Sequence, residues 1–92
     1  MARILKKEQL SELVVRLRID APRIARKRRA GQFVILRSAE MAERIPLTIA
    51  NADADGGWIE IIFQVVGHAT RSLAALDVGG EILDLAGPLG KP

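Results

Sequence analysis

The sequence predicts an all-β domain, a small closed barrel with one short helix. Three observations lead to this fold class. Six short apolar segments are separated by turn-forming residues, which is the pattern of a small barrel. The segment Leu13–Asp20 alternates between apolar and polar residues, as a half-buried strand does. After Gly67 the apolar spacing changes to that of a helix. With 92 residues, 49% of them hydrophobic, the chain has the length of one domain with its own core.

The first third of the chain predicts two strands followed by a basic connection. The first strand begins at Ile4 and runs to about Glu8, and the second is Leu13–Asp20. In the second strand the apolar side chains share one face and the arginines the other: Val15, Leu17 and Ile19 against Arg16 and Arg18. Pro22 ends this strand, because proline cannot donate to the ladder. The connection through Ala30 is expected to be a loop with at most one helical turn.

The middle of the chain predicts a buried strand and then a hairpin. The buried strand is Gln32–Leu36, which a glycine precedes. Pro46 lies in the next apolar run, which places it at an edge, a strand start or a ligand-facing rim. A turn of Asn, Asp and Gly residues, 51–57, leads into the longest strand, Trp58–Val66. Residues 44–66 are therefore expected to form a β-hairpin.

The last third predicts a short helix, a final strand and a tail. Apolar residues recur at helical spacing after the glycine: Ala69, Leu73 and Leu76. Thr70 is suited to cap this helix, two glycines end it, and Glu81–Ala86 is the last strand. Residues 87–92 are rich in Gly and Pro, a composition typical of the segment between two domains. The domain prediction is a barrel at residues 1–86 and a linker at 87–92.

Composition excludes several classes of site. The chain has no cysteine, so it offers no disulfide, thiolate metal site or iron–sulfur cluster of its own. Its one histidine, His68, rules out a multi-histidine site, and no metal is predicted. No run approaches the ~18 apolar residues of a membrane span, and the charged N-terminus is unlike a secretory signal. A cytoplasmic location without membrane contact is the expectation.

A basic cluster between residues 23 and 29 contributes most to the net charge of +3. It consists of Arg23, Arg26, Lys27, Arg28 and Arg29. Such a cluster is either a solvated turn or the electrostatic footprint of nucleic-acid binding. No aromatic residue interleaves with it, so a base-stacking surface has little support, and no nucleic-acid partner is predicted.

The residues by themselves do not identify an enzyme. No Ser/His/Asp arrangement stands out, and Asp53 and Asp55 lie beside glycines as turn formers. His68 is either an exposed loop histidine or a group that polarises a ligand.

An anion site has more support, although its parts also have a plain structural interpretation. Gly67 allows a ligand to approach the backbone, and Thr70 adds a hydroxyl at the start of a helix. Arg44 supplies a planar fork for phosphate oxygens. If the strand with Arg44 pairs with the strand that ends at Gly67, these groups share one rim and predict a diphosphate site. The competing interpretation is an ordinary glycine turn with a threonine cap.

Four segments, in this order, resemble the flavin-binding domain of the ferredoxin–NADP reductase superfamily. They are GQFVIL from Gly31, RIPLTI from Arg44, QVVGHATRSLAAL from Gln64 and GGEILDLAGPLGKP from Gly79. Within the superfamily the sequence is most similar to the electron transfer subunits of dihydroorotate dehydrogenase B. It is equally similar to the alpha subunit of NADH-dependent reduced ferredoxin:NADP oxidoreductase, also called a sulfide dehydrogenase subunit.

The resemblance implies a six-stranded antiparallel Greek-key barrel that holds FAD. The residues that it implies as FAD contacts are Arg44, Pro46, Leu47, Thr48, Gln64, Val65, Val66, Gly67, Ala69 and Thr70. Leu47 falls where many relatives place an aromatic ring against the flavin, and Thr48 where they place a hydroxyl beside it. The segment 64–67 resembles the strand along the ribityl chain, and 67–70 the turn that holds the diphosphate.

The resemblance also implies a role and partners. Members of the family pass electrons through FAD between a nicotinamide nucleotide, NAD(H) or NADP(H), and an iron–sulfur partner. They continue past the GPLG segment into a nucleotide-binding domain. The expectation is therefore the flavin half of an oxidoreductase that works with such a domain and an iron–sulfur subunit. Two other interpretations remain: a basic barrel that binds nucleic acid, and a cofactor-free fragment whose exposed face near Leu85–Leu89 drives self-association.

Overall fold

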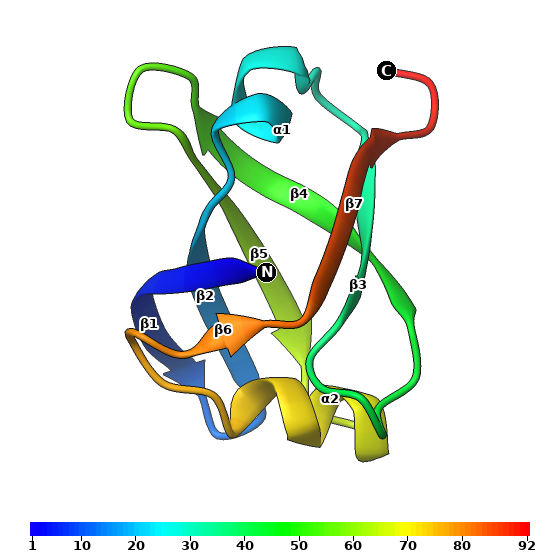
Figure 1. The fold of residues 1–92 in the computed structure, drawn as a ribbon. Helices are drawn as coiled ribbons and strands as arrows, with labels where there is room; N and C mark the ends of the chain where they lie inside the picture. Colours follow the sequence, from blue (N-terminus) through cyan, green and yellow to red (C-terminus); the bar gives the residue numbers. More distant parts are fainter.

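The computed structural model describes the whole chain, from Met1 to Pro92. It has seven strands and two short helices (Figure 1). In chain order these are β1 (Ala2–Ser11), β2 (Val14–Asp20), α1 (Pro22–Lys27), β3 (Phe33–Arg37), β4 (Ile45–Asp53), β5 (Trp58–Gln64), α2 (His68–Ala74), β6 (Glu81–Ile82) and β7 (Asp84–Leu89).

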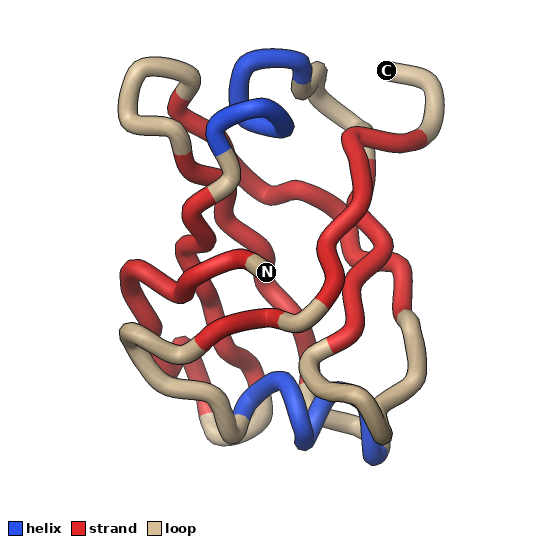
Figure 2. Tube along the Cα trace, in the orientation of Figure 1, coloured by secondary structure: helices blue, strands red, loops and turns tan.

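The strands form one antiparallel sheet in the order β6-β1-β2-β5-β4-β3-β7. The two strands at its edges, β6 and β7, are separated in the chain only by Leu83. The sheet therefore curls until its edges meet and becomes a nearly closed barrel, which the tube in Figure 2 shows from the front. The expected barrel is confirmed, and so is the hairpin, because β4 pairs with β5 across the turn at Gly57.

The prediction of six strands is wrong by one, because the expected last strand divides in two. β6 pairs with β1, whereas β7 pairs with β3, so the chain changes partner at Leu83. β7 also continues to Leu89, and three residues that the sequence placed in the linker lie in this strand. A Cβ at Gly87 would lie 2.9 Å from Val34 Cγ1, so only glycine allows β7 to approach β3 this closely.

Two further elements are longer than the sequence predicts. β1 runs from Ala2 to Ser11 rather than from Ile4 to Glu8, because it pairs with β2 along most of its length and with β6 at its start. Its second half is mostly exposed and therefore carries no apolar pattern. The connection after β2 contains the helix α1, which starts at Pro22 and buries two apolar side chains, Ile24 and Ala25.

The core fills the barrel with side chains from the inner faces of the strands. The expected alternation in β2 is confirmed, because Val15, Leu17 and Ile19 are fully buried between arginines that face outward. Ile59, Ile61 and Phe63 of β5 lie opposite them. The helix α2 lies at the lower end of the barrel (Figure 1), and from it only Leu73 is buried in the core.

Lys7 fastens the C-terminus of α2 to β1. Its Nζ donates to the carbonyl oxygens of Ala74 and Leu76 at 2.6 and 2.9 Å, and lies 3.5 Å from a carboxylate oxygen of Asp77. The last carbonyls of a helix have no intrahelical donor, and a cation at this end also favours the helix dipole.

We therefore expect Lys7→Met to lower the free energy of unfolding by about 1–2 kcal/mol, because it removes the donor and leaves the carbonyls half-buried. Urea denaturation followed by circular dichroism measures this. The matched control is Lys6→Met, which removes an exposed ammonium that makes no hydrogen bond or ion pair. Equal losses for the two variants would mean that the cap contributes nothing.

Candidate functional site

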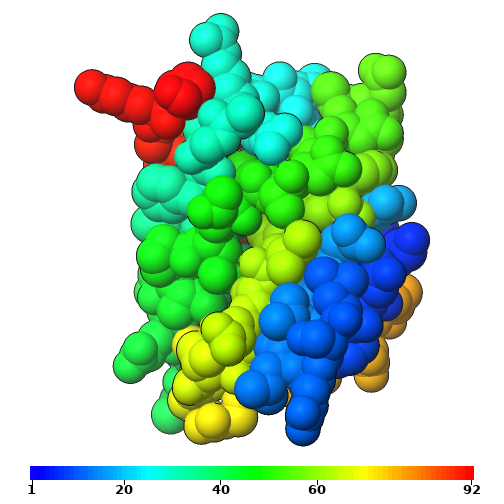
Figure 3. All heavy atoms as spheres, turned by 180° about the vertical axis from the view of Figure 1, so that it is seen from behind, coloured from blue at the N-terminus to red at the C-terminus, as the bar shows by residue number.

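The ladder between β4 and β5 opens toward the lower end of the barrel. The two strands pair only from Ile49 onward, with a register shift directly after it. The first four residues of β4, 45–48, pair with β3 alone, and the last three residues of β5, 62–64, pair with β2 alone. Figure 3 shows β4 (green) and β5 (yellow-green) side by side on the outer surface. Backbone groups and side chains on both sides of the opening are therefore available to a ligand.

Most of the site residues predicted in the two strands face outward at this opening. Pro46 and Thr48 are exposed on β4, and Gln64 and Val66 are exposed at the end of β5. Ile62, which the sequence analysis did not include, lies beside them and is 41% exposed. The period-2 alternation of β5 was a signal for it, since Ile62 falls on the face opposite the buried Ile61 and Phe63.

Leu47 and Val65 do not lie on this outer surface. Both side chains are half-buried and pack against the core. Leu47 was expected where an aromatic ring stacks on a flavin, but alternation along β4 turns it inward, away from Pro46 and Thr48. It supports the strand from inside.

The turn before α2 is held by Thr70. Its hydroxyl oxygen accepts hydrogen bonds from the N–H groups of Val66 and Gly67 at 2.9 and 3.0 Å, and its O–H donates to the Gly67 carbonyl at 3.1 Å. The predicted capping role is confirmed, with the hydroxyl acting from the first turn of the helix. Because this hydroxyl already accepts two hydrogen bonds and donates one, it has no donor or acceptor left for a ligand. The exposed His68 and the half-buried Ala69 follow the cap.

Gly67 has no conformational need to be glycine. Its φ of −157° is extended, and nothing lies within 4 Å of the place a Cβ would occupy. Gly67 directly precedes α2, whose first backbone N–H groups have no acceptor within the helix.

Arg44 stands directly before β4 and points to a carboxylate on β7. Its Nη2 donates to Asp84 Oδ2 at 3.0 Å, and its side chain is 59% exposed. The same oxygen accepts from Arg37, whose Nε and Nη2 lie at 3.0 and 2.7 Å. Sequence reasoning missed Arg37 and Asp84, because they come together only through the register of β3 and β7.

Arg44 and the turn at residues 67–70 lie at the same end of the barrel. Figures 1 and 3 show the start of β4 and α2 together at the lower end, in opposite views. A hydrogen bond of 2.7 Å between the Ser38 and Ser72 hydroxyls joins the connection before β4 to α2. The start of β4 and the turn at 67–70 thus lie at the same end of the barrel, while the Arg44 guanidinium is directed toward Asp84 on β7.

One cavity, of about 400 Å³, lies elsewhere, at the seam between the N-terminus, α1 and β7. None of the predicted site residues lines this cavity. Its lining consists of Met1, Ala2, Asp20, Ala21, Pro22, Arg23, Ile24, Leu85, Ala86 and Gly87. No residue of β4 or β5 lines the cavity, so we place the candidate site at the opening between these two strands instead.

The stretch Leu85–Leu89, which the sequence offered as a face for self-association, is mostly covered. Only Ala86 in it is exposed, and Leu85 packs against the core.

Charged side chains elsewhere are mostly paired or solvated. Arg16 donates to Glu8 and, through that hydrogen bond and its charge, holds the pKa of Glu8 below its usual range, while Glu8 raises the pKa of Arg16. Arg18 binds the buried Glu60 at 3.0 Å and lies 3.9 Å from the centre of the Trp58 ring. These contacts leave the outer faces of β1 and β2 with few unpaired charges.

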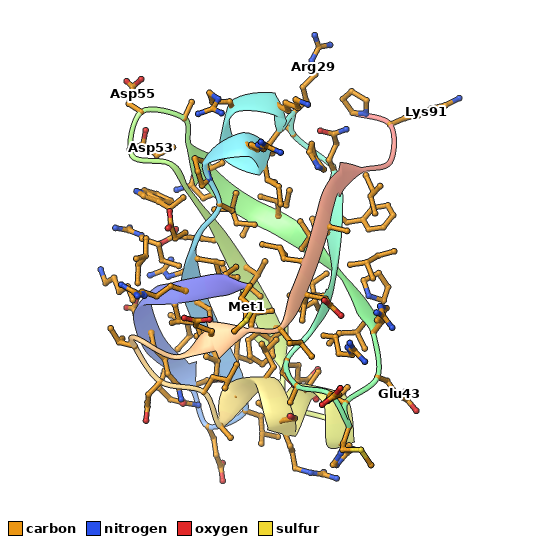
Figure 4. The ribbon with its side chains drawn as sticks, in the orientation of Figure 1. Met1, Arg29, Glu43, Asp53, Asp55 and Lys91 are labelled. Atoms are coloured by element: carbon orange, nitrogen blue, oxygen red, sulfur yellow. The ribbon has the colours of Figure 1, made fainter.

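The basic cluster surrounds α1 at the upper end of the barrel, where Figure 4 labels Arg29. Four of its five cations are exposed, whereas Arg28 is half-buried and donates from Nη2 to the Ile49 carbonyl at 3.4 Å. Asp53 Oδ1 accepts from the Asp55 N–H at 3.0 Å, so this pair forms the turn as predicted. Neither helix has the length and apolar composition that crossing a bilayer requires, and no three His, Cys, Asp or Glu residues gather around a point where a metal would fit.

No protein-family model matches the chain, but curated proteins align with nearly all of it. It is 44% identical over 92 residues to an uncharacterized protein in the adh 3′ region of Clostridium beijerinckii, covering 100% of this chain and 31% of that protein. It is 40% identical over 89 residues to the dihydroorotate dehydrogenase B (NAD(+)) electron transfer subunit homolog of Thermotoga maritima, covering 97% and 32%. The chain spans about a third of the length of the curated relatives it matches.

Solved structures agree with these relatives. The structure of an NADH-dependent reduced ferredoxin–NADP oxidoreductase, described for flavin-based electron bifurcation, superposes with a TM-score of 0.97 and 39% identity, over 100% of this chain and 33% of that one. The cytochrome b5 reductase domain of Ulva prolifera nitrate reductase has a TM-score of 0.76 at 19% identity over 97% and 39%, and shares the fold alone. The chain therefore belongs to the ferredoxin–NADP reductase superfamily, as a barrel domain homologous to dihydroorotate dehydrogenase B electron transfer subunits.

Proposed function

We propose that the chain is the flavin-binding part of an electron-transferring oxidoreductase and that its cofactor is FAD. The observation that carries the proposal is the likeness, at 39% identity over the whole chain, to a reductase described for flavin-based electron bifurcation. The opening between β4 and β5 supports it, because this surface combines apolar contacts with hydrogen-bonding groups, and the cation of Arg44 directly precedes β4.

The residues at the opening fit a flavin ring. A flavin is flat, with an apolar edge and a polar edge. Pro46, Ile62 and Val66 offer exposed apolar contacts, and Thr48 and Gln64 offer hydrogen-bonding groups on the same surface. When bound, the flavin supplies the redox chemistry, and these side chains orient it and exclude water from one of its faces.

The groups at the lower end fit a diphosphate. Nothing lies within 4 Å of the place where a Gly67 side chain would be, and we propose that phosphate oxygens use this space to bind the N–H groups of His68, Ala69 and Thr70. Arg44 uses one guanidinium nitrogen for Asp84 and keeps its other donors free for a bidentate contact. FAD carries a diphosphate and FMN does not, so this end of the site favours FAD.

The wider protein is also a matter of proposal. The curated relatives are about three times as long as this chain. We propose that a nucleotide-binding domain for NAD(H) or NADP(H) and an iron–sulfur partner complete the electron path, in the cytoplasm. The barrel by itself has no acid, base or nucleophile grouped for chemistry, so we assign it cofactor binding and no separate reaction.

Titration of the purified chain with FAD tests the proposed function. We expect saturable quenching of flavin fluorescence and a shift of the flavin absorbance bands at micromolar FAD, with weaker binding of FMN and riboflavin. A folded sample that changes neither signal at several hundred micromolar FAD would contradict the proposal. Retention of the chain on heparin, lost at moderate salt, would instead favour the nucleic-acid alternative.

A further inference from the structure

We propose that Asp84 is a positioning residue, which holds the Arg44 guanidinium ready for a phosphate group while Arg37 offsets its charge. This inference rests on the proposed function and adds to it, since it names the group that makes the site select a diphosphate-bearing flavin. Neither Asp84 nor Arg37 is among the site residues predicted from the sequence.

Arg37 holds the carboxylate of Asp84 in place independently of Arg44. Asp84 is the register partner of Arg37 in the β3–β7 ladder, so the two side chains meet across neighbouring strands. Arg37 is only 21% exposed, donates from Nε to Asp84 Oδ2 and has its Nη2 2.7 Å from the same oxygen, and its Nη1 also donates to the Glu40 carbonyl at 3.3 Å. The carboxylate therefore has one preferred place on the barrel.

Arg44 has no other anchor. It precedes β4, whose pairing with β3 starts at Ile45, and its guanidinium makes one hydrogen bond, to Asp84. A long, 59% exposed side chain without this contact would sample many rotamers. The hydrogen bond restricts that freedom before a ligand arrives, so less entropy is lost when a phosphate binds.

The charges leave the site attractive to an anion. Two guanidinium groups share one carboxylate oxygen, so the group of Arg37, Asp84 and Arg44 carries a net positive charge. Without Arg37, the carboxylate would cancel the charge of Arg44 and repel phosphate. Arg37 thus permits Asp84 to orient Arg44 without disabling it.

The sign of a charge-removing substitution separates positioning from simple electrostatics. If Asp84 acted on the ligand only through its negative charge, Asp84→Asn would strengthen FAD binding. If it positions Arg44, the same change weakens FAD binding, by about three- to tenfold for one long side chain that must be immobilised anew. Riboflavin, which has no phosphate, should bind both proteins equally.

Glu43→Gln is the matched control. Glu43 neighbours Arg44 in the chain, is exposed, and makes no hydrogen bond or ion pair, and Figure 4 shows it pointing away from the barrel. Its replacement removes the same charge without touching the network. We expect Glu43→Gln to leave FAD affinity unchanged or to raise it slightly.

The experiment measures FAD and riboflavin dissociation constants by fluorescence for five proteins: the unaltered chain, Asp84→Asn, Glu43→Gln, Arg44→Met and the double variant Asp84→Asn/Arg44→Met. We expect Asp84→Asn to have no effect once Arg44 is gone. Tighter FAD binding by Asp84→Asn, or an equal loss with and without Arg44, would overturn the inference. Failure of the unaltered chain to bind either flavin would overturn the proposed function and this inference with it, whereas normal FAD binding by Asp84→Asn overturns the inference alone.

Discussion

Replacing Arg44 by methionine is expected to weaken FAD binding by about ten- to a hundredfold, which corresponds to about 1.5–3 kcal/mol. Methionine keeps much of the side-chain length but removes the charge and all donors. Hydrogen bonds to a charged group lie in this range, and the Arg44 side chain is 59% exposed, so its guanidinium is accessible to a ligand. Fluorescence titration with FAD measures the change.

The control for Arg44 is a cation of equal charge at the far end of the barrel. Arg29→Met removes an exposed guanidinium from the basic cluster at the upper end, as Figure 4 shows. It is a better control than a change at Arg28, whose guanidinium contacts β4 through the Ile49 carbonyl. Riboflavin affinity should stay the same in both variants. Equal losses of FAD affinity for Arg44→Met and Arg29→Met would remove Arg44 from the site.

Leu73→Ala is expected to cause the largest loss of stability from α2, about 2–5 kcal/mol. Leu73 is fully buried and is the one side chain of the helix in the core, where it fills the lower end of the barrel. Its truncation leaves a cavity that the strands around it do not collapse to fill. A domain of this size has a stability of roughly 5–15 kcal/mol, so the midpoint of thermal unfolding should fall by about 10 °C or more.

Arg71→Ala is the matched change for Leu73, since Arg71 belongs to the same helix and is exposed. It should alter the free energy of unfolding by no more than about 0.5 kcal/mol. Circular dichroism during heating measures both variants. Equal midpoints of thermal unfolding for Leu73→Ala and Arg71→Ala would contradict the view that the buried leucine holds α2, and with it the turn at Gly67, on the barrel.

Elements that depend on the spacing of apolar residues within about ten positions were predictable from the sequence. They are the strand Leu13–Asp20, the hairpin at 44–66 and the helix after Gly67. The division of the last strand was not predictable. It depends on β6 and β7 choosing different partners at distant places in the chain.

The candidate site shows the same contrast. Pro46, Thr48 and Gln64 could be selected from motifs, and all three are exposed on the strands that border the opening. The inward position of Leu47 required the register of β4, which only the ladder with β3 defines. The carboxylate that holds Arg44 lies 40 residues away from it in the chain, and no local pattern links them.

By itself the sequence determined the fold class, the absence of cysteine from this chain and the ordered motifs of a reductase barrel. These follow from composition and from short-range periodicity, which sterics and hydrogen bonding convert directly into strands and helices. Only the tertiary structure decided where β4 parts from β5, which side chains face that opening, and that Arg37 and Asp84 stand beside Arg44. Those arrangements depend on strand register and on closure of the barrel, which make neighbours of residues tens of positions apart in the chain. The apolar–polar alternation within one strand does not specify which strand it pairs with or in which register.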